Sequence, residues 1–349
     1  MSEFLEKYRD LSTDHFESCW EAPSNIAFVK YWGKKAHQIP ANPSLSMTLN
    51  ECRTTTKTKF APADSLSVSL KLDGMMNEKF ALKIRDYLST LKVDLPLIQK
   101  LSVSIETSNT FPHGAGIASS ASGLAAFALT LCDYLNHLNP ENNQYLFYKR
   151  ASYLSRLASG SACRSVFGGY ASWGESELFG STDLFATPME VHPECAVLKD
   201  TILVISGKEK NISSRAGHER MTEHFFAESR FAQAKHHFTQ CVSGLRSGDL
   251  EAVGKILEAE ALSLHAMMMT SPNPYTLLKP NTLAAIDAVW NFRRETKIPL
   301  FFTLDAGPNL HLIYPDAVNK KIDSFISSEL KPLCEKILFD KTGEGPSKC

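Results

Sequence analysis

The sequence contains the stretch Pro112-His113-Gly114-Ala115-Gly116-Ile117-Ala118-Ser119-Ser120-Ala121-Ser122, whose small residues run directly into an apolar, alanine-rich segment. Apolar side chains then recur at helical spacing as far as Leu135, which predicts a helix beginning near Gly116 or Ile117. The start of a helix carries unpaired N–H groups and partial positive charge, and preceding glycines let an anion approach the backbone. The stretch therefore predicts either a phosphate-binding loop, with Ser119 and Ser120 as donors to phosphate or ligands of a phosphate-bound metal, or a turn whose serines cap the helix.

The composition indicates a globular protein of about two domains. The chain has 349 residues, of which 43% are hydrophobic and 21% charged, with a formal net charge of −1. A net charge this close to zero predicts no nucleic-acid or membrane partner. An anionic substrate would therefore have to be bound by cationic side chains gathered at its site. No apolar run is long enough to span a bilayer, and no signal peptide is evident. A mixed stretch at 175–195 divides the expected domains, 1–190 and 191–349.

The eight cysteines have no regular spacing and form no CxxC pair. This pattern predicts reduced thiols in the cytoplasm better than a disulfide framework or a zinc site. The last ten residues, rich in lysine and glycine, predict a loose tail.

Three charged residues stand in segments where they could act in chemistry. Lys30 lies among apolar residues, as either an edge side chain that reaches solvent or a cation held in a cleft. Arg164 lies in a cluster of small residues at 158–165, as a carboxylate or phosphate ligand or a solvated turn residue. Asp305 lies at the turn of an expected hairpin, as a base or a turn residue that bonds its own backbone.

Hydrophobic periodicity predicts mostly antiparallel strands in the first part, followed by helices and a last hairpin. The expected strands are 44–49, 53–60, 66–72, 101–105, 166–173, 196–205, 301–304, 310–314 and 337–339. The expected helices, besides the one after the glycine-rich stretch, are 77–91, 144–157, 217–226, 230–247, 250–269, 281–294 and 316–326.

Together these features supply what phosphoryl transfer from ATP needs: a loop for the phosphates, cations for the charge and a carboxylate base. The loop is neither a Walker A motif nor a good dinucleotide fingerprint. Its Pro112-x-x-x-Gly116-Ile117-Ala118-Ser119-Ser120-Ala121 pattern resembles the phosphate-binding motif of the GHMP kinase superfamily.

Four more motifs narrow this resemblance to one branch, the diphosphomevalonate decarboxylase family. They follow in family order over roughly residues 20–315, which makes the set far more specific than any one motif. The motifs are Asn25-Ile26-Ala27 with Lys30-Tyr31-Trp32-Gly33-Lys34, Ser44-Leu45-Ser46-x-Thr48-Leu49, Ser159-Gly160-Ser161-Ala162-Cys163-Arg164-Ser165 and Asp305-Ala306-Gly307-Pro308-Asn309.

The resemblance implies an α+β, two-domain GHMP kinase fold, with an N-terminal domain like domain 2 of ribosomal protein S5 and a ferredoxin-like α/β C-terminal domain. It implies that ATP phosphorylates the 3-hydroxyl of 5-diphosphomevalonate and that phosphate and carbon dioxide then leave, giving isopentenyl diphosphate. It also implies Mg²⁺ as the partner of ATP and a cytoplasmic homodimer.

The resemblance further assigns roles to residues. Asp305 would accept the hydroxyl proton, Lys30 would hold that carboxylate ionised, and Arg164 would engage the substrate carboxylate. Further substrate-binding positions would be Asn25, Tyr31, Lys34, Ser159 and Ser161. The ATP phosphates would meet Pro112, Gly114, Ala115, Gly116, Ile117, Ala118, Ser119 and Ser120, with Ser119 or Ser120 also reaching the magnesium ion.

The sequence departs from the family pattern at Pro43, His113, Arg215 and His218. These departures leave open whether the substrate is the 5-diphosphate. The alternatives are a related enzyme acting on 5-phosphomevalonate or mevalonate, and a non-catalytic protein of this fold that binds a phosphorylated metabolite.

Overall fold

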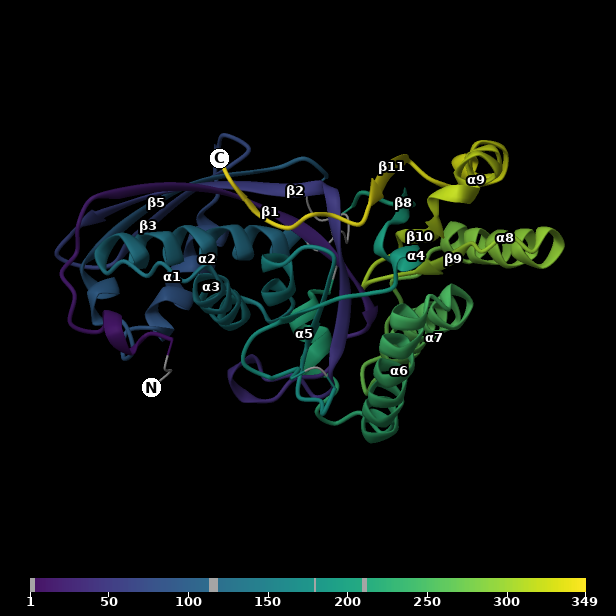
Figure 1. The fold of residues 1–349 in the computed structure, drawn as a ribbon, viewed down its shortest axis with the longest axis horizontal. Coiled ribbons are helices and arrows are strands. Elements are labelled where there is room, and N and C mark those ends of the chain that lie inside the picture. Colours follow the sequence, from purple (N-terminus) through teal and green to yellow (C-terminus); the bar gives the residue numbers. More distant parts are fainter. Residues whose placement is uncertain (1–3, 113–118, 179, 209–211) are drawn as a thin grey trace.

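The computed structural model describes residues 4–112, 119–178, 180–208 and 212–349. Its strands form two sheets, one of eight strands and one of four. Helices α1 (Glu78–Thr90), α2 (Ser119–Leu138) and α3 (Gln144–Ala158) cover one face of the larger sheet, and α6 (Ala227–Ser247), α7 (Leu250–Met269) and α8 (Pro280–Thr296) lie beside the smaller one (Figure 1). Helices grouped against mainly antiparallel sheets are the arrangement that the α+β prediction describes.

The larger sheet is built around two long strands, β1 (Phe16–Val29) and β2 (Ser44–Pro62). Its order is β12-β1-β2-β5-β3-β4, and β6 pairs with the start of β2 and with β7. The other bounds are β3 (Ser67–Leu72), β4 (Met75–Met76), β5 (Leu101–Asn109), β6 (Tyr170–Trp173), β7 (Thr187–Met189) and β12 (Ser347–Lys348). The two strands predicted at 44–49 and 53–60 are one continuous strand, and β3 runs parallel to β5 because α1 makes the crossover between them.

Helix α2 begins at Ser119 and packs its alanine-rich face against the larger sheet, where Leu124, Ala125 and Ala128 are buried. The start predicted near Gly116 or Ile117 falls within residues 113–118, which lie outside the described part. The predicted helices at 77–91 and 144–157 are confirmed as α1 and α3, which Asn77 and Asn143 cap by accepting backbone N–H bonds.

The smaller sheet is antiparallel throughout, in the order β11-β8-β10-β9. Its strands are β8 (Leu198–Val204), β9 (Phe301–Thr303), β10 (Leu310–Pro315) and β11 (Lys336–Lys341). The predicted hairpin at 301–314 is confirmed, with Asp305 between β9 and β10. The short helices are α4 (Pro193–Ala196), α5 (Ser214–Glu219) and α9 (Asn319–Phe325), with single turns at Glu6–Tyr8, Ala36–Gln38, Pro96–Lys100, Gly160–Val166, Asp316–Val318, Ile326–Leu330 and Lys331–Leu333.

The two sheets share one apolar core where the end of β1 meets the second half of the chain. Phe28 of β1 belongs to the same buried cluster as Ile202 of β8, Phe238 of α6 and Val253 of α7. Asp340 of β11 adds a polar contact, because its carboxylate accepts the backbone N–H groups of residues 50–52 at 2.7–2.9 Å. The end of β1 is therefore fixed against α6 and α7.

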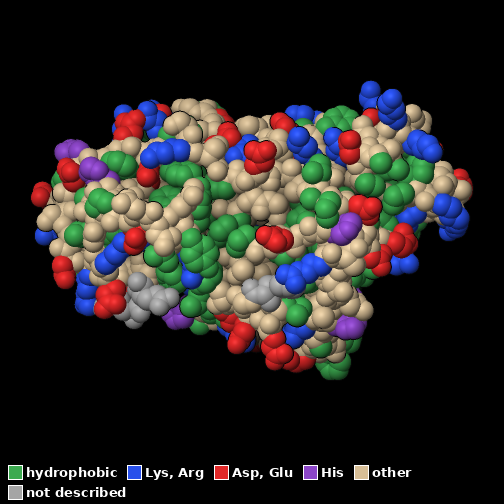
Figure 2. Space-filling model, viewed as in Figure 1, with side chains coloured by type: hydrophobic (Ala, Val, Ile, Leu, Met, Phe, Trp, Pro, Cys, Tyr) green, Lys and Arg blue, Asp and Glu red, His purple; other side chains and the backbone are tan. Residues whose placement is uncertain are grey.

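The surface carries charges of both signs. Figure 2 shows Lys and Arg side chains interspersed with Asp and Glu over the face in view, as the net charge of −1 leads one to expect. No helix within the described ranges has the length and apolarity that crossing a bilayer demands.

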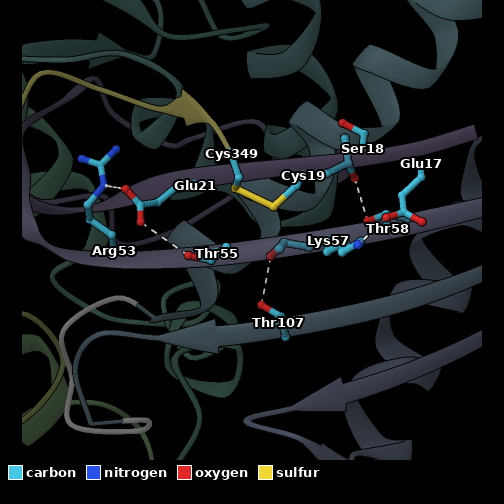
Figure 3. The surroundings of a disulfide bond; sticks show 12 residues. Glu17, Ser18, Cys19, Glu21, Arg53, Thr55, Lys57, Thr58, Thr107 and Cys349 are labelled. Atoms are coloured by element: carbon cyan, nitrogen blue, oxygen red, sulfur yellow. Dashed lines mark hydrogen bonds and ion pairs between the residues drawn. A yellow bond between two sulfur atoms is a disulfide. The ribbon is translucent and has the colours of Figure 1, made fainter.

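The end of the chain is held to the larger sheet, so the prediction of a loose tail is wrong. β12 pairs with β1, and a disulfide joins Cys19 to Cys349 with 5.3 Å between their Cα atoms (Figure 3). Arg53 adds a hydrogen bond to the Gly345 carbonyl oxygen at 2.6 Å. The prediction that the thiols are all reduced is wrong for this pair, because spacing along the sequence could not reveal two cysteines brought together from 330 residues apart. The other six cysteines are free thiols.

Replacing Cys349 with serine should lower the free energy of unfolding of the oxidised protein by about 2–4 kcal/mol, because the disulfide closes a very long loop in the unfolded chain. Thermal unfolding with and without reductant measures this. Reductant should lower the Tm of the wild type and leave the Tm of Cys349→Ser unchanged. Equal responses of the two proteins would show that the disulfide does not stabilise the fold.

Candidate active site

Lys30 follows β1 directly and is buried, with only 2% of its side chain exposed. Its ammonium group donates to Asp305 Oδ1 at 3.1 Å and to the Ala27 carbonyl oxygen at 2.6 Å. Burial lowers the pKa of Lys30, and the Asp305 carboxylate opposes that shift. The alternative of an edge lysine that reaches solvent is therefore wrong, and Lys30 is a cation held inside the protein.

Asp305 occupies a turn that other elements hold from several sides. Its carbonyl oxygen accepts bonds from Gly307 N at 2.7 Å and from His265 Nε2 at 3.1 Å. Thr282 of α8 donates to the Pro308 carbonyl oxygen at 2.7 Å, and the Asn309 amide exchanges two hydrogen bonds with the backbone of Ser206. The Asp305 side chain is 27% exposed although its lysine partner is buried. This carboxylate can therefore meet a bound molecule while it stays paired.

Arg164 lies in the single turn Gly160–Val166 that follows α3, and it is also buried. Its Nη1 donates to Ser44 Oγ at 2.5 Å, and its guanidinium lies 5.9 Å from the ring centre of Trp173. Its Nε has no hydrogen-bond partner within the described part of the chain. Burial lowers the pKa of Arg164 and the Asp305 charge opposes this, so the two groups lie close enough to interact. The solvated-turn alternative is wrong, and the guanidinium retains a donor for an anion.

Tyr31 packs edge-on against Trp173, with 4.7 Å between ring centres. Its hydroxyl is buried and has no hydrogen-bond partner among the described residues, and burial raises its pKa, so the phenol stays protonated. A Cβ atom at Gly160 would come within 2.6 Å of the Trp173 ring and 3.0 Å of the Tyr31 ring. Glycine is therefore needed at position 160 for the turn that carries Arg164 to approach these rings.

His218 of α5, one of the departures from the family pattern, lies against the rings of Tyr31 and Trp32 at 4.3 and 4.7 Å. Its Nδ1 accepts the Gly33 backbone N–H at 3.0 Å, which places its ring proton on Nε2. Burial, with a smaller contribution from the Lys34 charge, lowers the pKa of His218 to about 3. His218 is therefore neutral at physiological pH and fixes α5 beside the site.

The free energy of unfolding should fall as the pH drops from about 6.5 toward 3. In this range His218 is protonated in the unfolded chain but stays neutral in the folded protein. This one group contributes a slope of about 1.4 kcal/mol per pH unit. A His218→Gln variant keeps an acceptor for Gly33 and should show a shallower slope. Urea unfolding of both proteins across this range measures the difference, and parallel curves would contradict the assignment.

The other predicted substrate-binding residues differ in burial and in the groups that they contact. Lys34 is half-buried, its Nζ lies 3.4 Å from Gln38 Oε1, and burial together with the Arg215 charge lowers its pKa. Asn25 is buried, and its amide donates to Ser165 Oγ at 2.8 Å and weakly to the Ser161 carbonyl oxygen at 3.4 Å. In the structure Asn25 therefore positions the turn that carries Arg164. Ser159 and Ser161 are half-buried at the start of that turn.

The predicted phosphate-binding residues are described only at their edges. Pro112 is half-buried after β5, and Ser120 is exposed in the first turn of α2. Gly114, Ala115, Gly116, Ile117 and Ala118, and the side chain of Ser119, lie outside the described part. The residues that are described contain no group of three or more His, Cys, Asp and Glu side chains that could hold a metal ion. The hydroxyl of Ser120 at a helix start fits a nucleotide phosphate or a magnesium ion bound to it.

The structure adds residues that sequence reasoning missed. Asn42 donates to the Lys30 carbonyl oxygen at 3.0 Å, and Glu260 of α7 accepts the Lys30 N–H at 2.8 Å. His265 of α7 donates to the Asp305 carbonyl oxygen at 3.1 Å. The signal that could have found the two α7 residues is a carboxylate and an imidazole within a mostly apolar helix.

Comparison with known proteins decides the family. Residues 22–186 match the family model described as the diphosphomevalonate decarboxylase-like N-terminal domain, and residues 179–348 match the mevalonate 5-diphosphate decarboxylase C-terminal domain. The chain belongs to the diphosphomevalonate decarboxylase family. Among curated relatives, the diphosphomevalonate decarboxylase of Debaryomyces hansenii is 30% identical over 88% of this chain and 81% of its own length. That of Schizosaccharomyces pombe is 32% identical over 82% of this chain and 76% of its own length.

Solved structures agree with the sequence relatives. The mevalonate diphosphate decarboxylase from Enterococcus faecalis superposes with a TM-score of 0.81 at 29% identity and covers 96% of this chain and 99% of its own. The mevalonate diphosphate decarboxylase from Staphylococcus aureus superposes with a TM-score of 0.83 at 27% identity and covers 96% of this chain and 98% of its own. A further structure, of a protein designated MDDEF, contains MVAPP, AMPPCP and magnesium. It superposes with a TM-score of 0.82 at 29% identity and covers 96% of this chain and 99% of its own. The predicted family and the GHMP kinase-like fold are confirmed.

Proposed function

We propose that the chain catalyses the ATP-dependent decarboxylation of 5-diphosphomevalonate to isopentenyl diphosphate, with release of ADP, phosphate and carbon dioxide. The observation that carries this proposal is the pair of a buried Lys30 ammonium and a partly exposed Asp305 carboxylate, with the Arg164 guanidinium nearby. The family membership and the ligands named for the solved relative support the same reaction.

In the first step Asp305 accepts the proton of the tertiary 3-hydroxyl while the hydroxyl oxygen attacks the γ-phosphorus of ATP. Lys30 keeps the carboxylate ionised, because an adjacent cation favours the charged form of an acid. ADP leaves with the electron pair of the broken P–O bond. Magnesium bound to the nucleotide supplies charge neutralisation at the phosphates.

In the second step the 3-phosphate leaves with the electron pair of its C–O bond. The bond between the carbon chain and the substrate carboxylate breaks, and its electrons form the new carbon–carbon double bond as carbon dioxide departs. Arg164 pairs with the substrate carboxylate and holds it beside the reacting carbon, and the Tyr31 hydroxyl offers a further donor.

The remaining assignments complete the proposal. The stretch from Pro112 to Ser120 binds the ATP phosphates, with Ser119 or Ser120 reaching the magnesium ion. Lys34, Ser159 and Ser161 bind the substrate. The active form is a cytoplasmic homodimer, and the domains divide near residue 190.

One assay separates this proposal from its alternatives. Mevalonate, its 5-phosphate and its 5-diphosphate are each supplied with Mg-ATP, and ADP and carbon dioxide are measured separately. We expect equal amounts of both products from the 5-diphosphate. Both products from the 5-phosphate alone would identify a related decarboxylase, ADP without carbon dioxide would identify a kinase, and neither product from any of the three would identify a binding protein.

A further inference from the structure

Helix α7 carries three buried polar side chains that the proposed mechanism does not use, Glu258, Glu260 and His265, and the last two contact the Lys30–Asp305 pair. Glu260 is fully buried, and His265, further along the same helix, is 1% exposed. Burying a carboxylate costs free energy unless hydrogen bonds and a counter-charge compensate. Packing alone does not account for these two residues.

Glu260 holds the main chain at Lys30. Its Oε2 accepts the Lys30 N–H at 2.8 Å, while Arg230 of α6 donates to both carboxylate oxygens at 3.0 and 2.5 Å. His237 Nδ1 lies 2.6 Å from Oε1 and must donate, because an ionised carboxylate only accepts. Burial alone would raise the pKa of Glu260, but the bonds from His237 and Arg230 outweigh it and lower that pKa. Glu260 is therefore a charged acceptor that is fixed in place.

His265 holds the main chain at Asp305. Its Nε2 lies 3.1 Å from the Asp305 carbonyl oxygen, and since a carbonyl oxygen only accepts, this nitrogen carries the proton. The two halves of the Lys30–Asp305 pair are 275 residues apart in sequence and follow strands of different sheets. One helix thus contacts the backbone of both.

We propose that α7 positions the catalytic pair, with Glu260 fixing the backbone of Lys30 and His265 fixing the backbone of Asp305 so that their side chains meet at reacting distance. Both are positioning residues that act through Lys30 and Asp305. The inference rests on the proposed decarboxylation. A displacement of about 1 Å at such a pair can cost about 100-fold in rate, so loosening either contact should lower kcat while the substrate still binds.

The first test compares two substitutions at His265. Leucine fills a similar volume but donates no hydrogen bond, whereas glutamine restores a donor on a side chain of similar reach. We expect His265→Leu to lower kcat about 10- to 100-fold, with the KM values for ATP and the 5-diphosphate within about threefold of wild type. His265→Gln should recover most of the lost kcat, which a merely space-filling role would not predict.

The second test removes Glu260 together with its counter-charge, so that no buried charge is left unpaired. The double variant Glu260→Leu/Arg230→Met should lower kcat by about 10-fold or more, again with little change in KM. The matched control is Glu258→Leu/Arg293→Met, which removes another ion pair anchored on α7. Glu258 bonds Arg293 and Trp290 instead of the catalytic pair, so the control should keep wild-type kcat.

Unfolding temperatures of all variants separate loss of fold from loss of positioning. Wild-type kcat in both His265→Leu and the Glu260 double variant, with folding intact, would overturn the inference. An equal loss of kcat in the Glu258 control would also overturn it, since any change in α7 would then have the same effect. If the wild-type protein releases no carbon dioxide from any substrate, the proposed function itself fails, which is a different outcome from either of these.

Discussion

Asp305→Asn should lower kcat for the 5-diphosphate by about 10²- to 10⁴-fold, the contribution expected of a positioned general base. Asparagine has nearly the same shape and can still accept the hydrogen bond from Lys30, but it cannot take up the proton of a tertiary hydroxyl. Nucleotide affinity should stay close to that of the wild type. Steady-state kinetics give kcat, and calorimetric titration of a non-hydrolysable ATP analogue in the presence of substrate gives the affinity.

The amide leaves Lys30 buried without its counter-ion, so stability needs its own control. The double variant Lys30→Met/Asp305→Asn removes both charges and should be equally inactive while it folds more stably than the single variant. Asp316→Asn changes an exposed carboxylate that pairs with Lys199 at the other end of β10, and it should keep full activity. A kcat for Asp305→Asn within about tenfold of wild type would show that Asp305 is not the base.

Arg164→Lys should lower kcat/KM for the 5-diphosphate by about 10²- to 10³-fold, mainly through a higher KM, as expected when a buried hydrogen-bonded charge pair is broken. The planar guanidinium bonds Ser44 through Nη1 and still has donors left for a carboxylate. A single ammonium group cannot hold both partners in that geometry. Initial rates at varied substrate and saturating Mg-ATP measure the change.

The matched control is Arg150→Lys. Arg150 is also a buried arginine stacked on an aromatic ring, that of Tyr8, but it lies on α3 within the core of the larger sheet. Its substitution should lower Tm without raising KM. If Arg164→Lys kept a wild-type KM, or if both variants raised KM alike, Arg164 would not be a substrate ligand.

Local patterns predicted most of the secondary structure. Alternating and helical periodicities located α1, α3, α6, α7, α8 and the β9–β10 hairpin, because these signals depend only on which face of an element is buried. They failed for the helix expected at 217–226, where the structure has only the short α5, and they failed where the outcome depended on distant partners. Strand β3 pairs in parallel with β5, and the last residues pair with β1. The sequence of a strand does not specify which other strand it pairs with.

For the candidate site, residue types and motif order predicted that Lys30, Arg164 and Asp305 carry the chemistry, and the same motifs predicted the family. The sequence by itself determined which residue types are available, because the proposed reaction calls for a base, a cation beside it and a guanidinium for a carboxylate, and these types can be read without coordinates.

Only the tertiary structure decided how these groups are arranged. It buried Lys30 and left Asp305 partly exposed, directed Asn25 onto the turn that carries Arg164, and brought Glu260 and His265 of α7 to the backbone of Lys30 and Asp305. Burial, electrostatic interaction and hydrogen-bond reach depend on distance in space. Lys30 and Asp305 are 275 positions apart in the sequence, and they come into contact only because the two sheets and the helices beside them pack around one core.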